Sequence, residues 1–163
     1  MYEVKVASME EFQKSRERWN ELVLAMRRPS IFCTWEWVHT WWENFGKSYQ
    51  PLILFVYKES ALVGILPLAI RNMIIEDAMI PARVLSFCGT FELYPDHMDI
   101  ICGKEDVFPS LDLLFEFLKT KKSGWDLLHL SHISEDSFLM EWLGKQDRGF
   151  KVEGAGGSPY IPL

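Results

Sequence analysis

No stretch of this sequence is long and apolar enough to cross a membrane. The longest apolar run, 61–70, contains Gly64 and Pro67. It falls well short of the roughly 18 to 20 residues that a transmembrane helix needs. The first six residues, 1–6, alternate polar and apolar side chains and lack the basic region, apolar core and cleavage site of a signal peptide. We therefore expect neither a membrane span nor a cleaved leader.

Cysteine and positive charge are also scarce. The three cysteines, Cys33, Cys88 and Cys102, are an odd number at wide spacing in apolar surroundings. This pattern argues against a disulfide framework and predicts buried, reduced thiols in a cytoplasmic protein. The 17 lysines and arginines are outnumbered by 23 acidic residues, which gives a formal net charge of −6. A negative chain is a poor binder of nucleic acid or of an anionic membrane surface.

What the sequence does have is the composition of an ordinary globular domain. The chain has 163 residues, of which 48% are hydrophobic and 25% charged. At this length a compact fold buries roughly 70% of the surface that the unfolded chain exposes, so neither a metal nor a disulfide is needed for stability. We predict one domain over residues 1–153. The Gly, Ser and Pro residues of 154–163 are typical of a linker or of the start of a second domain.

Hydrophobic periodicity and capping signals predict a mixed, mostly antiparallel sheet of about seven strands flanked by about four helices, in the α/β (α+β) class. An extended connection is expected over 71–81. The expected helices are 9–27, 35–45, 106–119 and 135–146, and the expected strands are 2–6, 52–57, 61–70, 83–87, 97–102, 125–130 and 150–152.

The predicted helix 35–45 is more aromatic than a buried stripe requires. Trp41 and Trp42 lie on its apolar face, which favours a place in the core or at an interface. Trp35 and Trp37 flank that face. Because indole rings also stack on sugars, these two are candidate substrate-binding residues, with core packing as the alternative.

Several local strings resemble the N-terminal half of the CelD/BcsL family. These are GNAT-superfamily acetyltransferase-like proteins of cellulose or exopolysaccharide biosynthesis, related to FemAB-type aminoacyl transferases. The order of the predicted elements also resembles the GNAT fold. The strings are Phe32–Trp37 with Trp41–Gly46, Leu62–Leu68, Asp96–Asp99, Gly124–Leu128 and Ser158–Tyr160.

The resemblance implies that acetyl-CoA or another acyl-CoA is the donor in the full-length protein, with its thioester bound between splayed strands. GNAT enzymes bind the donor pyrophosphate on a glycine-rich loop at a helix N-terminus. The matching loop here, 103–106, has one glycine and two carboxylates, which repel pyrophosphate, and 151–156 has glycines but no helix after it. We therefore identify no cofactor-binding residue in this chain. The expected partner is a C-terminal GNAT-like domain or a second copy of the chain.

Candidate site residues cluster in 94–99. If acyl transfer occurs on this fold, strand alternation places His97 and Asp99 on one face, where either can serve as general base. Tyr94 and Asp96 are candidate substrate-binding residues beside Trp35 and Trp37. The alternative is that Asp96 is a turn residue and that His97 and Asp99 form a solvated face.

Metal and serine or cysteine nucleophile motifs are not recognisable. His129 and His132 lack a third ligand at a metal-site spacing, and no Gly-x-Ser-x-Gly sequence occurs. Three functions remain open: an acceptor-binding and architectural GNAT-like domain with its donor site elsewhere, a stand-alone acetyl-CoA-dependent N- or O-acetyltransferase that acts as a dimer, and a saccharide-binding module without catalysis.

Overall fold

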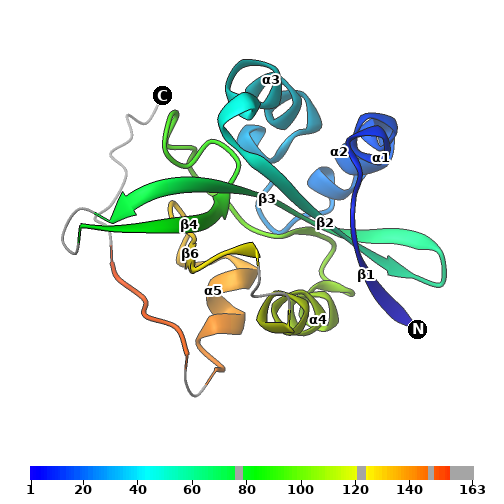
Figure 1. Cartoon of the computed structure of the whole chain (residues 1–163). Helices are drawn as coiled ribbons and strands as arrows, with labels where there is room; N and C mark the ends of the chain where they lie inside the picture. Colours follow the sequence, from blue (N-terminus) through cyan, green and yellow to red (C-terminus); the bar gives the residue numbers. More distant parts are fainter. Residues whose placement is uncertain (76–78, 121–123, 147–148, 155–163) are drawn as a thin grey trace, which may run out of the picture.

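A mixed sheet with helices on both of its faces organises the chain (Figure 1). The computed structural model describes residues 1–75, 79–120, 124–146 and 149–154. The strand order is β1-β2-β3-β4-β6, and β5 also pairs with β3. All pairings are antiparallel except that of β4 with β6. The strands are β1 (Tyr2–Val6), β2 (Gln50–Lys58), β3 (Ala61–Ile75), β4 (Ile80–Phe87), β5 (Ile101–Cys102) and β6 (Leu127–His129).

Helices α1, α2 and α3 lie on one side of the sheet, and α4 and α5 lie on the other (Figure 1). The predicted helix 35–45 is confirmed, with the Thr34 hydroxyl accepting from the Trp37 amide at 3.4 Å. The buried side chains of both layers form one hydrophobic cluster. The helices are α1 (Met9–Lys14), α2 (Arg16–Leu24), α3 (Trp35–Phe45), α4 (Val107–Thr120) and α5 (Phe138–Leu143).

The single helix expected over 9–27 is in fact two helices. Its start is confirmed, because Ser8 and Glu11 form a reciprocal capping box. The break comes at Ser15, whose hydroxyl and amide both donate to the Phe12 carbonyl, at 2.7 and 3.2 Å. A serine side chain that bonds to the preceding turn competes with the helical ladder.

The prediction of an extended connection over 71–81 is wrong at both ends, because β3 continues to Ile75 and β4 already begins at Ile80. Strand β3 also passes through Pro67, opposite Ile53 of β2. The Pro67 carbonyl accepts from the Cys88 amide at 3.1 Å, on the side where β4 has just ended. Since the N–H and C=O of a residue in an antiparallel strand point to the same neighbour, the missing proline N–H costs no ladder bond here.

Strand β4 leaves the sheet at this point and returns as β5. Leu68 of β3 pairs with Phe87, whereas Ile65 pairs with Ile101. On β3, Leu68 and Ile65 are three residues apart, whereas their partners Phe87 and Ile101 are fourteen residues apart. The segment opposite β3 therefore has eleven additional residues. They form a loop at 88–98, and only the last two residues of the strand expected over 97–102 are in β5. This loop positions the candidate site.

The C-terminal end of the described chain departs from expectation. Strand β6 and helix α5 are shorter than the predicted 125–130 and 135–146, and 150–152 form no strand. Phe150 instead packs edge-on against Phe115 of α4 and Trp142 of α5, with ring centroids 5.4 and 5.9 Å apart. Burial of one aromatic ring takes the place of strand pairing. The predicted linker lies outside the described residues from 155 onward.

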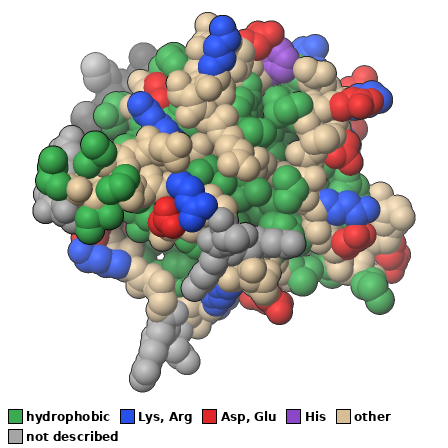
Figure 2. All heavy atoms as spheres, viewed as in Figure 1, with side chains coloured by type: hydrophobic (Ala, Val, Ile, Leu, Met, Phe, Trp, Pro, Cys, Tyr) green, Lys and Arg blue, Asp and Glu red, His purple; other side chains and the backbone are tan. Residues whose placement is uncertain are grey.

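Hydrophobic side chains gather at one end of the face shown in Figure 2, over the tip of the β3–β4 hairpin. Ile74, Met79 and Ile80 are 59%, 75% and 57% exposed there. Within the described ranges, none of the helices has the length and apolar character of a membrane span.

Candidate functional site

Strands β4 and β6 part around a group of polar and aromatic residues and then meet again. They pair in parallel up to Ser86 and His129, and beyond this point the loop 88–98 leaves the sheet. The segments that follow β4 and β6 pair again where Met98 bridges to Ile133 and the Met98 amide donates to the His132 carbonyl at 2.9 Å. Splayed neighbouring strands are where the resemblance places a thioester donor. Here main-chain pairing closes the far end of that gap.

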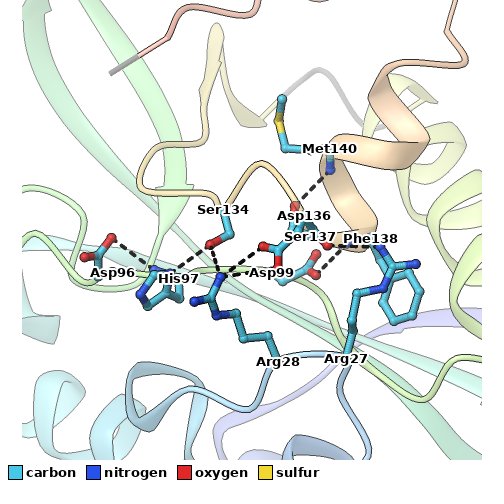
Figure 3. Close-up of polar contacts among 10 residues, drawn as sticks. All are labelled: Arg27, Arg28, Asp96, His97, Asp99, Ser134, Asp136, Ser137, Phe138 and Met140. Carbon is cyan, nitrogen blue, oxygen red and sulfur yellow. Dashed lines mark hydrogen bonds and ion pairs between the residues drawn. The ribbon is translucent and has the colours of Figure 1, made fainter. Parts of the chain in front are cut away.

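A chain of polar contacts crosses the gap (Figure 3). Nδ1 of His97 lies 2.8 Å from Oγ of Ser134. The Arg28 guanidinium donates to the same Oγ at 3.3 Å and to Asp136 at 3.1 Å. The Asp96 carboxylate accepts from the His97 amide at 3.2 Å. Arg28 and His97, from two segments distant in sequence, therefore converge on the Ser134 hydroxyl.

Backbone strain is concentrated at the same place. Tyr94, His97 and His132 have φ values of +48°, +55° and +59°. Non-glycine residues rarely adopt this left-handed conformation, which costs of order 1 kcal/mol or more and is enriched at functional sites. The Tyr94 and His132 rings meet edge to face with centroids 5.8 Å apart, and Tyr94 remains 66% exposed. The loop thus presents an aromatic face to solvent at an energetic cost.

The prediction that His97 and Asp99 share a strand face is wrong. The strand begins at Ile101, and the left-handed turn at His97 destroys the alternation. Asp99 is 7% exposed, and its carboxylate accepts from the amides of Ile100, Phe138 and Leu139 at 2.8, 2.9 and 3.0 Å. It caps the N-terminus of α5 and does not form a solvated face. Burial raises the pKa of this carboxyl, against the opposing effect of the three amides.

Trp35 and Trp37 lie in different environments. The Trp35 ring stacks on His39 at 4.3 Å and its indole N–H donates to the Phe12 carbonyl at 2.9 Å. Its contacts therefore tie α3 to α1. The Trp37 ring packs against Gly89 so closely that a Cβ there would lie 2.2 Å from Cη2. Trp37 thereby supports the start of the loop that carries Tyr94, Asp96 and His97.

A second polar cluster fixes this loop to α3 and the sheet. The Glu92 carboxylate accepts from Trp41 Nε1 at 3.2 Å, from the Tyr49 hydroxyl at 2.5 Å and from Arg71 at 3.0 Å. Its side chain is 17% exposed. Burial and the adjacent carboxylate raise the pKa of Tyr49, which keeps its proton in the bond to Glu92. The loop is held at both ends, so its strained residues are fixed in place.

The residues at the expected cofactor loop do not fit acyl-CoA. Asp106 immediately precedes α4, and its carboxylate accepts from the Lys58 ammonium at 2.7 Å and from the Tyr2 hydroxyl at 2.6 Å. These partners lower the pKa of Asp106 and keep it charged. Glu105 lies beside it, and Pro109 removes one of the free amides of the first turn. A pyrophosphate would meet carboxylates where it needs N–H donors.

Metal and thiol chemistry find no support in the part of the chain that the structure describes. No group of three or more His, Cys, Asp or Glu side chains is arranged to hold a metal ion in these residues. The three cysteines are free and buried, as predicted. Burial raises the pKa of Cys33 and of Cys102 to about 12, so the nucleophilic thiolate does not form near neutral pH.

Sequence reasoning missed Arg28 and Ser134. Arg28 stands at the end of a predicted helix, where a basic residue is unremarkable. Ser134 lies 37 residues from His97 and belongs to no motif. The one local signal near this site was the pair His129 and His132, which was interpreted only as a possible pair of metal ligands.

Comparison with known proteins shows the fold. No family model matches the chain, and no curated protein matches it significantly. Among solved structures, a Pyrococcus furiosus protein assigned as an acetyl transferase superposes with a TM-score of 0.58 at 16% identity, covering 99% of this chain and 100% of that one. A GNAT family acetyltransferase from Staphylococcus aureus is also similar, with a TM-score of 0.46, 10% identity and 98% coverage of both chains. The chain has the fold of the GNAT acetyltransferases.

The same fold also matches a transcriptional regulator from Bacillus halodurans, with a TM-score of 0.54, 10% identity, and coverage of 99% of this chain and 100% of that one. Proteins described by different activities thus share this fold. A fold hosts many functions, and the function has to be argued from the site.

Proposed function

We infer that this chain is an acetyltransferase-type GNAT domain that binds the acceptor and leaves the donor to another domain. The observation that carries this proposal is the carboxylate of Asp106 at the start of α4, paired with Lys58 and Tyr2. The Lys58 ammonium offsets part of its charge, but a carboxylate at this helix N-terminus still takes the place at the positive end of the helix dipole that a pyrophosphate would need. The rejoining of the strands at Met98 and Ile133 supports the same conclusion, because it closes the gap expected to admit the thioester.

The acceptor is, in this proposal, a saccharide of cellulose or exopolysaccharide synthesis. The exposed ring of Tyr94 offers an apolar face, and Asp96 and His97 of the same loop, with Ser134 bonded to His97, offer hydrogen-bonding groups. An apolar surface with a few fixed polar groups is typical of small-molecule sites. The proposed partner is a second GNAT-like domain that carries acyl-CoA. The buried free cysteines favour a reducing compartment such as the cytoplasm.

Calorimetric titration with acetyl-CoA tests the donor side of this proposal. We expect no saturable heat up to millimolar ligand. Saturable binding at micromolar concentration would overturn the proposal and favour a stand-alone acetyl-CoA-dependent enzyme. Light scattering on the same sample determines whether such binding belongs to a monomer or to a dimer.

Titration with a soluble cello-oligosaccharide tests the acceptor side. We expect binding that Tyr94→Ala abolishes and that Leu93→Ala leaves unchanged. Leu93 is the matched control because it is the neighbouring residue, 47% exposed, with no aromatic ring. Equal affinity of both variants and the wild type would place the sugar elsewhere. Absence of any binding would refute the saccharide assignment and leave the donor-side conclusion standing.

A further inference from the structure

The Ser134 hydroxyl has the surroundings of an activated nucleophile. Its Oγ lies 2.8 Å from Nδ1 of His97 and accepts from the Arg28 guanidinium at 3.3 Å (Figure 3). Both the serine and the histidine are partly accessible to solvent. A hydroxyl within hydrogen-bond distance of an imidazole is an arrangement that activates a serine nucleophile, because the base accepts its proton. The Arg28 guanidinium, which is also paired with Asp136, stabilises the negative charge that develops on Oγ.

The donors and acceptors available at this site allow this role. A guanidinium has only hydrogens to offer, so Ser134 Oγ is the acceptor in its contact with Arg28. The single hydroxyl hydrogen then remains available for the bond to His97. With its own proton on Nε2, the imidazole presents an acceptor at Nδ1. The backbone of His97, held at φ +55°, fixes the ring where the two atoms meet.

A second serine–histidine pair, Ser131 and His132, allows a comparison within the same protein. Ser131 Oγ lies 2.9 Å from Nδ1 of His132, two side chains that are adjacent in sequence. That pair resembles the first in its serine–imidazole bond. Among the described residues, no arginine donates a hydrogen bond to Ser131, whereas Ser134 accepts from Arg28. The chain therefore contains its own matched control.

We propose that Ser134 is an acyl-accepting nucleophile with His97 as its general base, which would make this domain a carrier of a covalent acyl group. The co-substrate is an activated acyl ester or thioester. Ser134 Oγ attacks the acyl carbonyl carbon, the new C–O bond forms, and the bond from that carbon to the leaving oxygen or sulfur breaks. The serine proton passes to His97 Nδ1 and from there to the leaving group. Attack by an acceptor hydroxyl reverses these steps and restores the free serine.

This role does not depend on the identity of the acceptor, and it requires no coenzyme A loop. The donor can be presented by another protein or as a free ester, because the Ser134 and His97 side chains are themselves partly accessible to solvent. The proposal therefore stands or falls separately from the saccharide assignment.

The experiment uses p-nitrophenyl acetate with the full chain. Release of nitrophenolate is followed by absorbance, and the acetylated residue is located by peptide mass mapping. We expect a burst of up to one equivalent with the acetyl group on Ser134. Ser134→Ala should abolish the burst, and Ser131→Ala should retain it.

His97→Asn separates chemistry from structure. Asparagine places an oxygen acceptor near the position of Nδ1 and tolerates the left-handed backbone, but it cannot take up the proton. We expect the burst rate to fall by about 100-fold or more, the range attributed to general-base catalysis, with an unchanged circular dichroism spectrum. This variant also decides the question if Ser134→Ala does not fold. Acetylation confined to lysines or Ser131, or a burst that persists at the wild-type rate in folded His97→Asn, would overturn the proposal.

Discussion

Replacing Asp99 by alanine removes the acceptor for three backbone amides inside the protein. The amides of Ile100, Phe138 and Leu139 lie 2.8, 2.9 and 3.0 Å from its carboxylate oxygens. A hydrogen bond to a charged group contributes about 1.5 to 3 kcal/mol, and each buried donor left without a partner adds a desolvation penalty. Part of this loss is offset because the substitution also removes a carboxylate that is costly to bury. We therefore expect the free energy of unfolding to fall by about 2 to 4 kcal/mol.

Urea unfolding followed by circular dichroism measures this loss. The matched control is Ser137→Ala, which removes the side-chain cap from the same helix, where Ser137 Oγ accepts from the Met140 amide at 3.0 Å. An N-cap hydroxyl contributes about 1 kcal/mol. Hydrogen exchange at Phe138 and Leu139 should lose protection in the Asp99 variant first, because those two amides begin α5. A loss below about 1 kcal/mol, or one no larger than that of Ser137→Ala, would refute the assignment of Asp99 as the principal cap of α5.

The raised pKa of Asp99 adds a pH dependence whose sign follows from linkage. Between the ordinary pKa of 3.8 and the raised native value, the folded state binds more protons than the unfolded state. The free energy of unfolding therefore falls as pH rises through that window. Asp99→Asn cannot titrate, so the difference in stability between wild type and variant should change there and be constant above it. A difference that is constant across the whole acid range would contradict the burial argument.

Three further substitutions test the loop and the α4 terminus. Gly89→Ala should lower the free energy of unfolding by about 2 to 4 kcal/mol, because φ is +84° and the new Cβ would lie 2.2 Å from the Trp37 ring. Gly103→Ala is its control, since the nearest atom is 3.8 Å away, and urea midpoints should rank the two in this order. Glu92→Gln should cost about 2 kcal/mol by weakening three side-chain bonds, and an unchanged midpoint would contradict that role. Asp106 has a lowered pKa, so its stabilisation is present above pH 3.8 and is lost as pH falls through the lowered value; Asp106→Asn should remove that part of the acid-induced loss measured by pH-dependent unfolding.

Local signals in the sequence were sufficient for most of the elements. The capping box at Ser8, the Thr34 cap and the aromatic stripe of 35–45 act between neighbouring residues, so the sequence shows them directly. Buried cysteines were predicted from their apolar surroundings for the same reason. The break of the first helix was missed although its cause is local, the bond from the Ser15 hydroxyl to the Phe12 carbonyl. The other errors arose where tertiary contacts override local preference. The connection expected over 71–81 is instead paired strand, because Ile70–Ile75 of β3 and Ile80–Leu85 of β4 hydrogen-bond to one another across the sheet.

The candidate site depended on long-range contacts. The cluster 94–99 was found from its residue types, but alternation gave the wrong geometry, because a single left-handed turn at His97 sends that side chain to Ser134 and leaves Asp99 to cap α5. The carboxylates of 103–106 were visible in the sequence as a barrier to pyrophosphate. That Asp106 is fixed by Lys58 and Tyr2 was not, since its partners lie 48 and 104 residues away.

Composition, periodicity and capping thus determined the class of the fold and the position of most elements, because these depend on interactions within a few residues. The tertiary structure alone decided which polar groups meet, because side chains such as those of Arg28, His97 and Ser134 are brought together only when separate segments pack.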